Sequence, residues 1–165
     1  MNYNLEHHLA YSIWANDTLV ERLKKLDDAI LHQEVKSSFP SIAKTLLHMW
    51  DAEVVWLKRF QGVSLTDWPS KNFNGTTTDL LNGVLKSSRD IQAFVASGGE
   101  RLVKGTIRYK NLKGNEFEDP VEPILYHIVN HGSYHRGQIT TMLRELGVTD
   151  LASTDIILYW RSLKK

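Results

Sequence analysis

The chain has 165 residues, of which 42% are hydrophobic and 24% are charged, with 10 glycines and 4 prolines. These values are typical of a globular protein, so disordered, collagen-like and low-complexity classes are excluded, and we expect a single domain over residues 1–165. Twenty lysines and arginines nearly balance nineteen aspartates and glutamates, which gives a net charge of +1. This balance argues against a nucleic-acid partner, because dedicated binders carry a clustered cationic surface.

The targeting and cysteine patterns narrow the chemistry further. No apolar run approaches the roughly 18 residues of a membrane span, and the N-terminus lacks the basic-then-apolar pattern of a signal peptide. We therefore expect a cytoplasmic protein with no membrane partner. The sequence has no cysteine, which excludes disulfides, thiolate ligands and a cysteine nucleophile. Any metal must then be bound through nitrogen or oxygen, and the seven histidines are the candidate ligands.

Hydrophobic spacing predicts four long helices. Their approximate expected ranges are residues 5–26, 41–60, 78–95 and 121–146. Ser41 is a suitable N-cap for the second helix, and Gly147 is a suitable C-terminal cap for the fourth. The third helix is expected to stop before Gly98, and residues 27–40 are expected to be irregular.

The hydrophobic pattern changes between the third and fourth helices. Alternating residues on either side of residues 111–114 predict two short strands joined as a hairpin. Residues 155–163 are compatible with one more short helix. Four amphipathic helices in one small domain favour an all-α fold, a four-helix bundle with a short β-hairpin inserted before the last long helix.

Two histidines of the last predicted helix lie one turn apart in its apolar stripe. A helical wheel places His131 and His135 within about 20° of Ile124, a residue of that stripe. Two imidazoles four residues apart on one helical face can bind one ion, although the missing glutamate after His131 excludes the HExxH protease motif. A buried unpaired nitrogen costs on the order of 1–3 kcal/mol, which favours a metal ion as its partner. The alternative is a pair of core histidines that hydrogen-bond to each other, to water or to carboxylates.

The remaining core candidates lie at less clear positions. His127 falls at the edge of the stripe, which is more typical of a surface residue than of a ligand. His48 lies in an apolar stretch of the second predicted helix but points away from the centre of its main apolar arc, so spacing alone leaves open whether it is the third ligand. The narrower face around it, with Thr45 and Val55, predicts a helix buried on two sides, one of them against a partner chain. Glu53 lies on the main arc and is expected either to support an imidazole or to form an interfacial ion pair.

Three other histidines are not expected to bind a metal. His7 and His8 are adjacent, so they point in different directions on a helix and share no face. His32 lies in the segment that is expected to be irregular. We expect all three to be solvated or to be bonded locally at the surface.

Several motifs resemble the DinB family. The most specific lies in residues 126–139, which contain the run Asn-His-x-x-x-His-Arg-Gly-Gln. Further similar stretches are Ile-Trp-Ala-Asn-Asp at residues 13–17, Leu-His, Ala-Glu and Trp-Leu within residues 47–57, and the hairpin turn at residues 111–115. The resemblance therefore extends over nearly the whole chain.

The resemblance to the DinB family implies a four-helix bundle related to bacterial thiol-dependent S-transferases and to a mycothiol-dependent isomerase. Such proteins bind a divalent metal, commonly zinc or nickel, through one histidine of the second helix and two of the last. Carried over by motif, the metal ligands are His48, His131 and His135. The resemblance also implies a homodimer formed through bundle helices. The family name refers to induction by DNA damage, but it implies no DNA binding.

Three imidazole ligands leave a divalent ion with an open position, which is typical of catalytic sites. We therefore hypothesise a metal-dependent enzyme, S-transferase-like or hydrolase-like, that activates a low-molecular-weight thiol or water for attack on a small electrophile. The pattern does not fix the catalytic residues, for which Glu53 and Tyr134 are candidates, and substrate specificity is expected near Trp68, Phe73 and the hairpin. The alternative is a non-catalytic metal-binding protein of the stress response.

Overall fold

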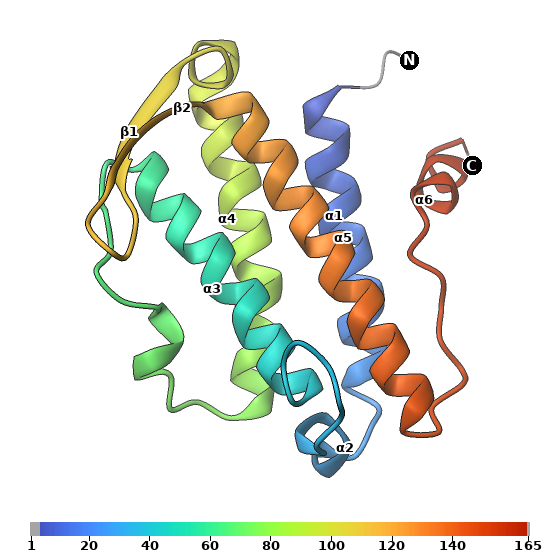
Figure 1. Ribbon diagram of the computed structural model, residues 1–165. Helices are drawn as coiled ribbons and strands as arrows, with labels where there is room; N and C mark the ends of the chain where they lie inside the picture. The colour runs from blue at the N-terminus through green and yellow to red at the C-terminus, as the bar shows by residue number, and fades with distance from the viewer. Residues whose placement is uncertain (1–3, 165) are drawn as a thin grey trace.

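A bundle of four long helices forms the body of the protein. The computed structural model describes residues 4–164. The long helices are α1 (Leu5–Leu23), α3 (Ile42–Phe60), α4 (Thr77–Val103) and α5 (Val121–Glu145). Figure 1 shows α3 and α5 side by side in front of α4 and α1. The predicted all-α four-helix bundle is confirmed.

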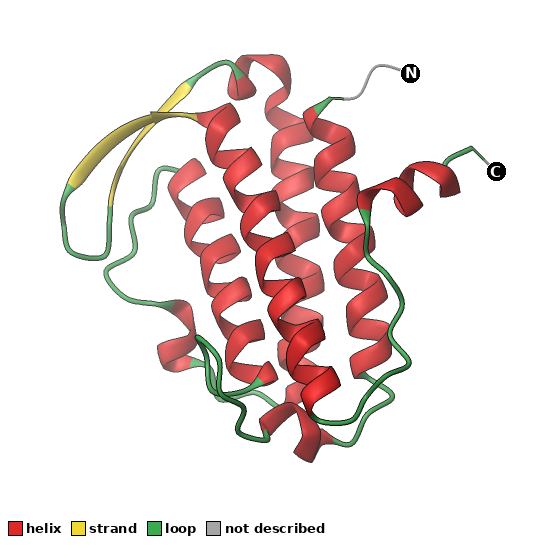
Figure 2. Ribbon diagram, turned by 45° about the vertical axis from the view of Figure 1, so that its right-hand side comes forward, coloured by secondary structure: helices red, strands yellow, loops and turns green. Residues whose placement is uncertain are grey.

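Shorter helices and two strands lie at the two ends and along the sides of the bundle. They are α2 (Asp28–His32), the 3₁₀ helix η1 (Pro69–Asn72), β1 (Thr106–Lys110), β2 (Glu116–Pro120) and α6 (Ile156–Ser162). The strands pair antiparallel as the predicted hairpin before α5, with Thr106 opposite Pro120. Figure 2 shows the hairpin projecting from one end of the bundle and α6 lying apart at its side. Within residues 4–164, no helix combines the length and apolar composition needed to cross a bilayer.

The helix ends follow the capping residues. The side chain of Ser41 accepts a hydrogen bond from the backbone N–H of Lys44, as expected of the predicted N-cap of α3. In contrast, α1 ends three residues earlier than predicted, and the segment expected to be irregular contains α2. The reason is Asp27, whose carboxylate accepts from the backbone N–H of Ala29 and so starts a new short helix.

The predicted end of the third helix is a kink. Helix α4 continues to Val103, but Gly99 has φ +56°, a conformation that glycine adopts without steric cost. At Gly98 an added Cβ would lie 2.6 Å from Cβ of Leu102, so glycine also allows that side chain to fold back. The last turn therefore packs Leu102 against the apolar core instead of ending in a loop.

The apolar core is divided into two clusters along the bundle. One cluster contains apolar residues within 19–23 of α1 and 139–143 of α5, and the other contains residues within 5–15 and 121–129. Between the clusters, the four long helices contribute the buried polar residues Asn16, Glu53, Ser87, Ser88 and Arg136. His131 and His135 fall in the same interval of α5. On α3, in contrast, His48 lies between Leu46 and Met49 of the first cluster, so the candidate site borders both the polar layer and that apolar cluster.

Candidate metal centre

Three histidines from α3 and α5 converge. Nε2 of His131 lies 3.0 Å from Nε2 of His48 and 3.1 Å from Nε2 of His135. One ligand nitrogen from each of the three side chains lies within 4.8 Å of the other two. The structure thus brings together the three residues that the family motif indicated, including His48, whose role the helical wheel had left open.

The two nitrogen pairs that share His131 have spacings that fit a divalent ion. Two nitrogens at about 2.0–2.1 Å from one ion lie roughly 2.8–3.4 Å apart for bond angles between about 90° and 110°. Nδ1 of His135 lies 2.7 Å from Oε1 of Gln138, an acceptor, so Nδ1 carries the proton and Nε2 presents its lone pair to His131. The donor set is therefore that of a cation site.

The environment of the cluster keeps its imidazoles neutral. Burial lowers the pKa of His131 to about 3, and the neighbouring histidines lower it in the same direction. Burial also lowers the pKa of His48, with a further contribution from His135. For His135, burial lowers the pKa and the bond to Gln138 partly opposes that effect. Neutral rings are the form that binds metal ions.

Aromatic side chains line the cluster. The ring of Phe39 stacks on His48 at a centroid distance of 4.4 Å, and Trp68 meets His48 edge-on at 6.2 Å. Tyr134 meets His135 edge-on at 5.1 Å. Trp68 and Tyr134 are 43% and 63% exposed. Within residues 4–164 no fourth histidine or carboxylate joins the three histidines. An ion bound there would therefore keep a position open toward this aromatic-lined face.

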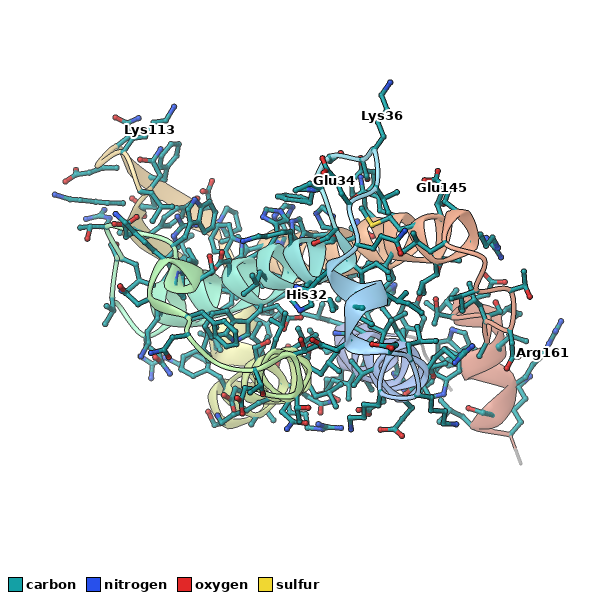
Figure 3. All side chains as sticks on the ribbon, turned by 90° about the horizontal axis from the view of Figure 1, so that it is seen from below. His32, Glu34, Lys36, Lys113, Glu145 and Arg161 are labelled. Atoms are coloured by element: carbon teal, nitrogen blue, oxygen red, sulfur yellow. The ribbon has the colours of Figure 1, made fainter. Side chains whose placement is uncertain are left out.

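Gln138 connects His135 to the loop before α3. Its Nε2 donates to Oγ of Ser38 at 3.1 Å and to the hydroxyl of Tyr134 at 3.2 Å. A groove of about 320 Å³ lies beside these residues, between the loop and α5. In Figure 3 the loop bearing Glu34 and Lys36 crosses α3 and α5, and Lys36 points away from the bundle. Gln138 was not among the predicted site residues, although its place three residues after His135 was the available signal.

Asp51 fixes the segment that carries Trp68. Its buried carboxylate accepts from the backbone N–H of Ser70 at 2.7 Å and from the Ser70 hydroxyl at 2.5 Å. Burial raises the pKa of Asp51, and both bonds from Ser70 lower it. The second aromatic residue predicted for this loop, Phe73, instead packs edge-on against Trp50 at 5.6 Å beside the apolar core. Of the two, Trp68 is the one that contacts the histidines.

Two predicted polar candidates lie outside the three-histidine set. The carboxyl group of Glu53 accepts hydrogen bonds from Ser87 and Ser88 of α4, in place of the expected imidazole or interfacial arginine. Burial raises the pKa of Glu53 to about 7, although the two serines and Arg136 lower it. His127 is exposed, with its ring 5.7 Å from that of His131.

The second face of α3 is buried within the same chain. Thr45 and Val55 are 0% and 3% exposed, and the hydroxyl of Thr45 lies 3.7 Å from Sδ of Met142. The two-sided burial predicted for this helix is present, but it needs no partner chain at these residues. Of the histidines that were not expected to bind a metal, His7 bonds locally to Asn4. His32 instead lies 2.9 Å from the hydroxyl of Thr77 at the start of α4, 45 residues away, which is a surface contact but not a local one.

Known proteins resemble this chain in sequence and in fold. The model of the DinB family matches residues 1–162. The chain is 34% identical over 156 residues to Protein DinB of Bacillus subtilis (strain 168), a match that covers 90% of this chain and 89% of that protein. The crystal structure of a DinB-like protein from Bacillus cereus ATCC 10987 has a TM-score of 0.63 and 18% sequence identity, and the match covers 84% of this chain and 90% of that chain. The crystal structure shows the same fold.

Proposed function

The chain belongs to the DinB family, and we propose that it is an enzyme that binds zinc or nickel through His48, His131 and His135. It activates a low-molecular-weight thiol or water for attack on a small electrophile. The observation that carries the proposal is the convergence of three imidazole Nε2 atoms at an exposed, aromatic-lined face. A divalent ion with three such ligands lowers the pKa of a thiol or water at its free position.

The chain's own residues would orient the reaction. Gln138 holds the proton of His135 on Nδ1, and Phe39 fixes the plane of the His48 ring by stacking. Trp68 and Tyr134 supply partly exposed aromatic surface on either side of the cluster. The hydroxyl of Tyr134 is our candidate for proton transfer, because it contacts Gln138 and faces solvent, whereas Glu53 is bonded to α4. Since the chain has no cysteine, a thiol nucleophile must come from a cosubstrate.

Turnover tests this proposal. Metal-loaded protein is incubated with bacillithiol or mycothiol and a panel of small electrophiles, and separately with ester and amide substrates. Metal-stripped protein and the His131→Ala variant serve as controls. We expect conjugation or hydrolysis only with the metal-loaded unaltered chain. Absence of both activities in protein that retains its metal would overturn the catalytic proposal.

A non-catalytic metal-binding protein of the stress response is the second candidate. The observation that favours it is the composition of the cluster, which within residues 4–164 includes no carboxylate to act as a base. The same assay separates the two candidates, because this protein would bind metal at full stoichiometry without turnover.

We also place the protein in the cytoplasm as a homodimer without a nucleic-acid or membrane partner. A cytoplasmic location suits a thiol cosubstrate, because low-molecular-weight thiols are kept reduced there. The dimer is implied by the resemblance to the family. Light scattering after size-exclusion chromatography is expected to give twice the chain mass of 18.9 kDa, and a mass equal to one chain would contradict it.

A further inference from the structure

A chain of hydrogen bonds crosses the bundle between the two apolar clusters. Nη1 of Arg136 donates to Oδ1 of Asn16 at 2.9 Å, and Nδ2 of Asn16 donates to Oγ of Ser88 at 2.8 Å. The hydroxyl of Ser88 donates to Oε1 of Glu53 at 2.8 Å. The chain therefore passes from α5 to α1, then to α4, and ends on α3, so that each of the four long helices contributes one side chain.

The donors of this chain all point in one direction. Each group donates toward Glu53 and accepts from the side of Arg136, so the chain links a guanidinium to a carboxyl group. Arg136 is 2% exposed and Glu53 is 7% exposed. A buried charge without partners is costly, and aligned hydrogen bonds polarise one another in a poorly solvated interior. Moving any one of the four helices would break a link and leave a buried polar group unpaired.

The two ends of the hydrogen-bond chain lie on the helices that bear the metal-ligand candidates. Arg136 follows His135 directly in α5, and Glu53 lies five residues after His48 in α3. Gly132 makes room for the guanidinium, because an added Cβ at that residue would lie 3.0 Å from Nη1 of Arg136. The two helices that bear the candidate ligands are therefore the two ends of the same chain.

Between the two apolar clusters, the interior of the bundle is occupied by the polar side chains of the hydrogen-bond chain. Apolar contact is non-directional and tolerates sliding, whereas hydrogen bonds have narrow limits of length and angle. Buried polar groups are known to fix helix register in other bundles. At the level of Glu53 and Arg136, directional bonds thus act between α3 and α5 in addition to the apolar cluster that contains residues of both helices.

We propose that the Arg136–Asn16–Ser88–Glu53 chain is a positioning device that holds α3 and α5 at the separation needed for His48 to share an ion with His131 and His135. The inference rests on the metal binding in the proposed function. A metal site needs its ligands held within about 0.5 Å of the productive geometry, and residues behind the ligands supply that precision. Asn16 and Ser88 act through the helices without touching the ion.

Two adjacent serines provide a matched test. Ser87 and Ser88 are both buried, and both donate to Glu53, but only Ser88 accepts from Asn16. Ser88→Ala therefore interrupts the hydrogen-bond chain, whereas Ser87→Ala removes a comparable hydroxyl and leaves the hydrogen-bond chain intact. The measurements are the Zn²⁺ dissociation constant by competition with a chromophoric chelator, the visible absorption spectrum with bound Co²⁺, and the melting temperature without metal.

We expect both variants to melt at a lower temperature than the unaltered chain. Only Ser88→Ala is expected to weaken Zn²⁺ binding, by roughly tenfold, and to change the Co²⁺ bands, which report the geometry of the ligands. The nearly isosteric Asn16→Asp is expected to behave like Ser88→Ala, since it keeps an oxygen for Arg136 and loses the donor to Ser88. It provides the same comparison if Ser88→Ala does not fold.

The results separate this inference from the proposed function. Equal Zn²⁺ affinity and equal Co²⁺ spectra in the chain-breaking variants and in Ser87→Ala would overturn the positioning role while leaving metal binding intact. An unaltered chain that binds neither Zn²⁺ nor Co²⁺ would overturn the metal site and this inference together. Metal binding without turnover would overturn only the catalytic part of the proposed function.

Discussion

Oε1 of Gln138 lies 2.7 Å from Nδ1 of His135, and this bond decides which nitrogen of the ring is free. Because an amide oxygen only accepts, Nδ1 must carry the proton, and Nε2 faces the other two histidines with its lone pair. The amide nitrogen of Gln138 donates to Ser38 and to Tyr134. The tautomer of His135 is thus linked through Gln138 to Ser38 in the loop before α3.

Gln138→Leu is expected to weaken Zn²⁺ binding by about tenfold or more, because His135 then loses the acceptor that orients it. Gln138→Glu keeps an acceptor oxygen and is expected to retain most of the affinity. Isothermal titration calorimetry or chelator competition measures both variants. Equal affinity of Gln138→Leu and the unaltered chain would show that the ring needs no such support.

Metal content is expected to separate two neighbouring histidines of α5. His131→Ala removes the central nitrogen of the cluster, which lies 3.0 Å and 3.1 Å from the other two, and is expected to lose stoichiometric metal. His127→Ala, one helical turn earlier, removes an exposed ring outside the ligand set and is expected to retain metal. Elemental analysis of the purified proteins measures both. Full metal occupancy in His131→Ala would exclude the proposed ligand set.

The stability of the metal-free protein is expected to depend on pH through Glu53. Burial raises its pKa in the folded state from 4.5 to about 7, so between these values the folded chain keeps a proton that the unfolded chain releases. The contribution of this group to stability is therefore complete below pH 4.5 and falls as pH rises to about 7. Glu53→Gln cannot titrate, so it is expected to gain on the order of 3 kcal/mol relative to the unaltered chain across this window.

Urea unfolding at several pH values, without metal, measures this difference between the two proteins. Groups that titrate in both, including the histidines, cancel in the comparison. A difference in the free energy of unfolding that stays constant from pH 4.5 to pH 7.5 would mean that Glu53 is ionised throughout, with its charge fully compensated by Arg136.

The sequence predicts the helices and the pair on α5 because both depend on short-range periodicity. Apolar residues at helical spacing mark α3 and α5, and His131 and His135 lie on the same stripe. His48 could be assigned only by resemblance, because α3 is buried on two faces. A helical wheel that assumes a single apolar arc treats the second buried face as if it were exposed. Asn16 could not be assigned from periodicity either. It is a polar residue among the core-facing positions of α1, and the hydrophobic pattern does not show what such a residue bonds to.

Other features follow from contacts between distant segments and leave little trace in local sequence. Phe39 reaches His48 only because the loop before α3 folds back over the bundle. Similarly, Trp68 is placed by the bonds of Asp51 to Ser70, 19 residues apart in the chain. The kink at Gly99 depends on the packing of the partly buried Leu102, which follows it, against the apolar core. Phe39 and Trp68 both contact His48, so the aromatic lining of the site is less predictable from sequence than the candidate ligands.

Two glycines of α5 give a final matched prediction. Gly137 has nothing within 4 Å of an added Cβ, so Gly137→Ala is expected to stabilise the protein by about 0.5–1 kcal/mol through the higher helix propensity of alanine. Gly132→Ala gains the same propensity, but its Cβ would press on Nη1 of Arg136, which is held by Asn16. We expect a net destabilisation of about 1–3 kcal/mol, as for other overpacked interiors. Chemical denaturation measures both, and stabilisation by Gly132→Ala would show that the guanidinium is free to shift and that the hydrogen-bond chain tolerates the movement.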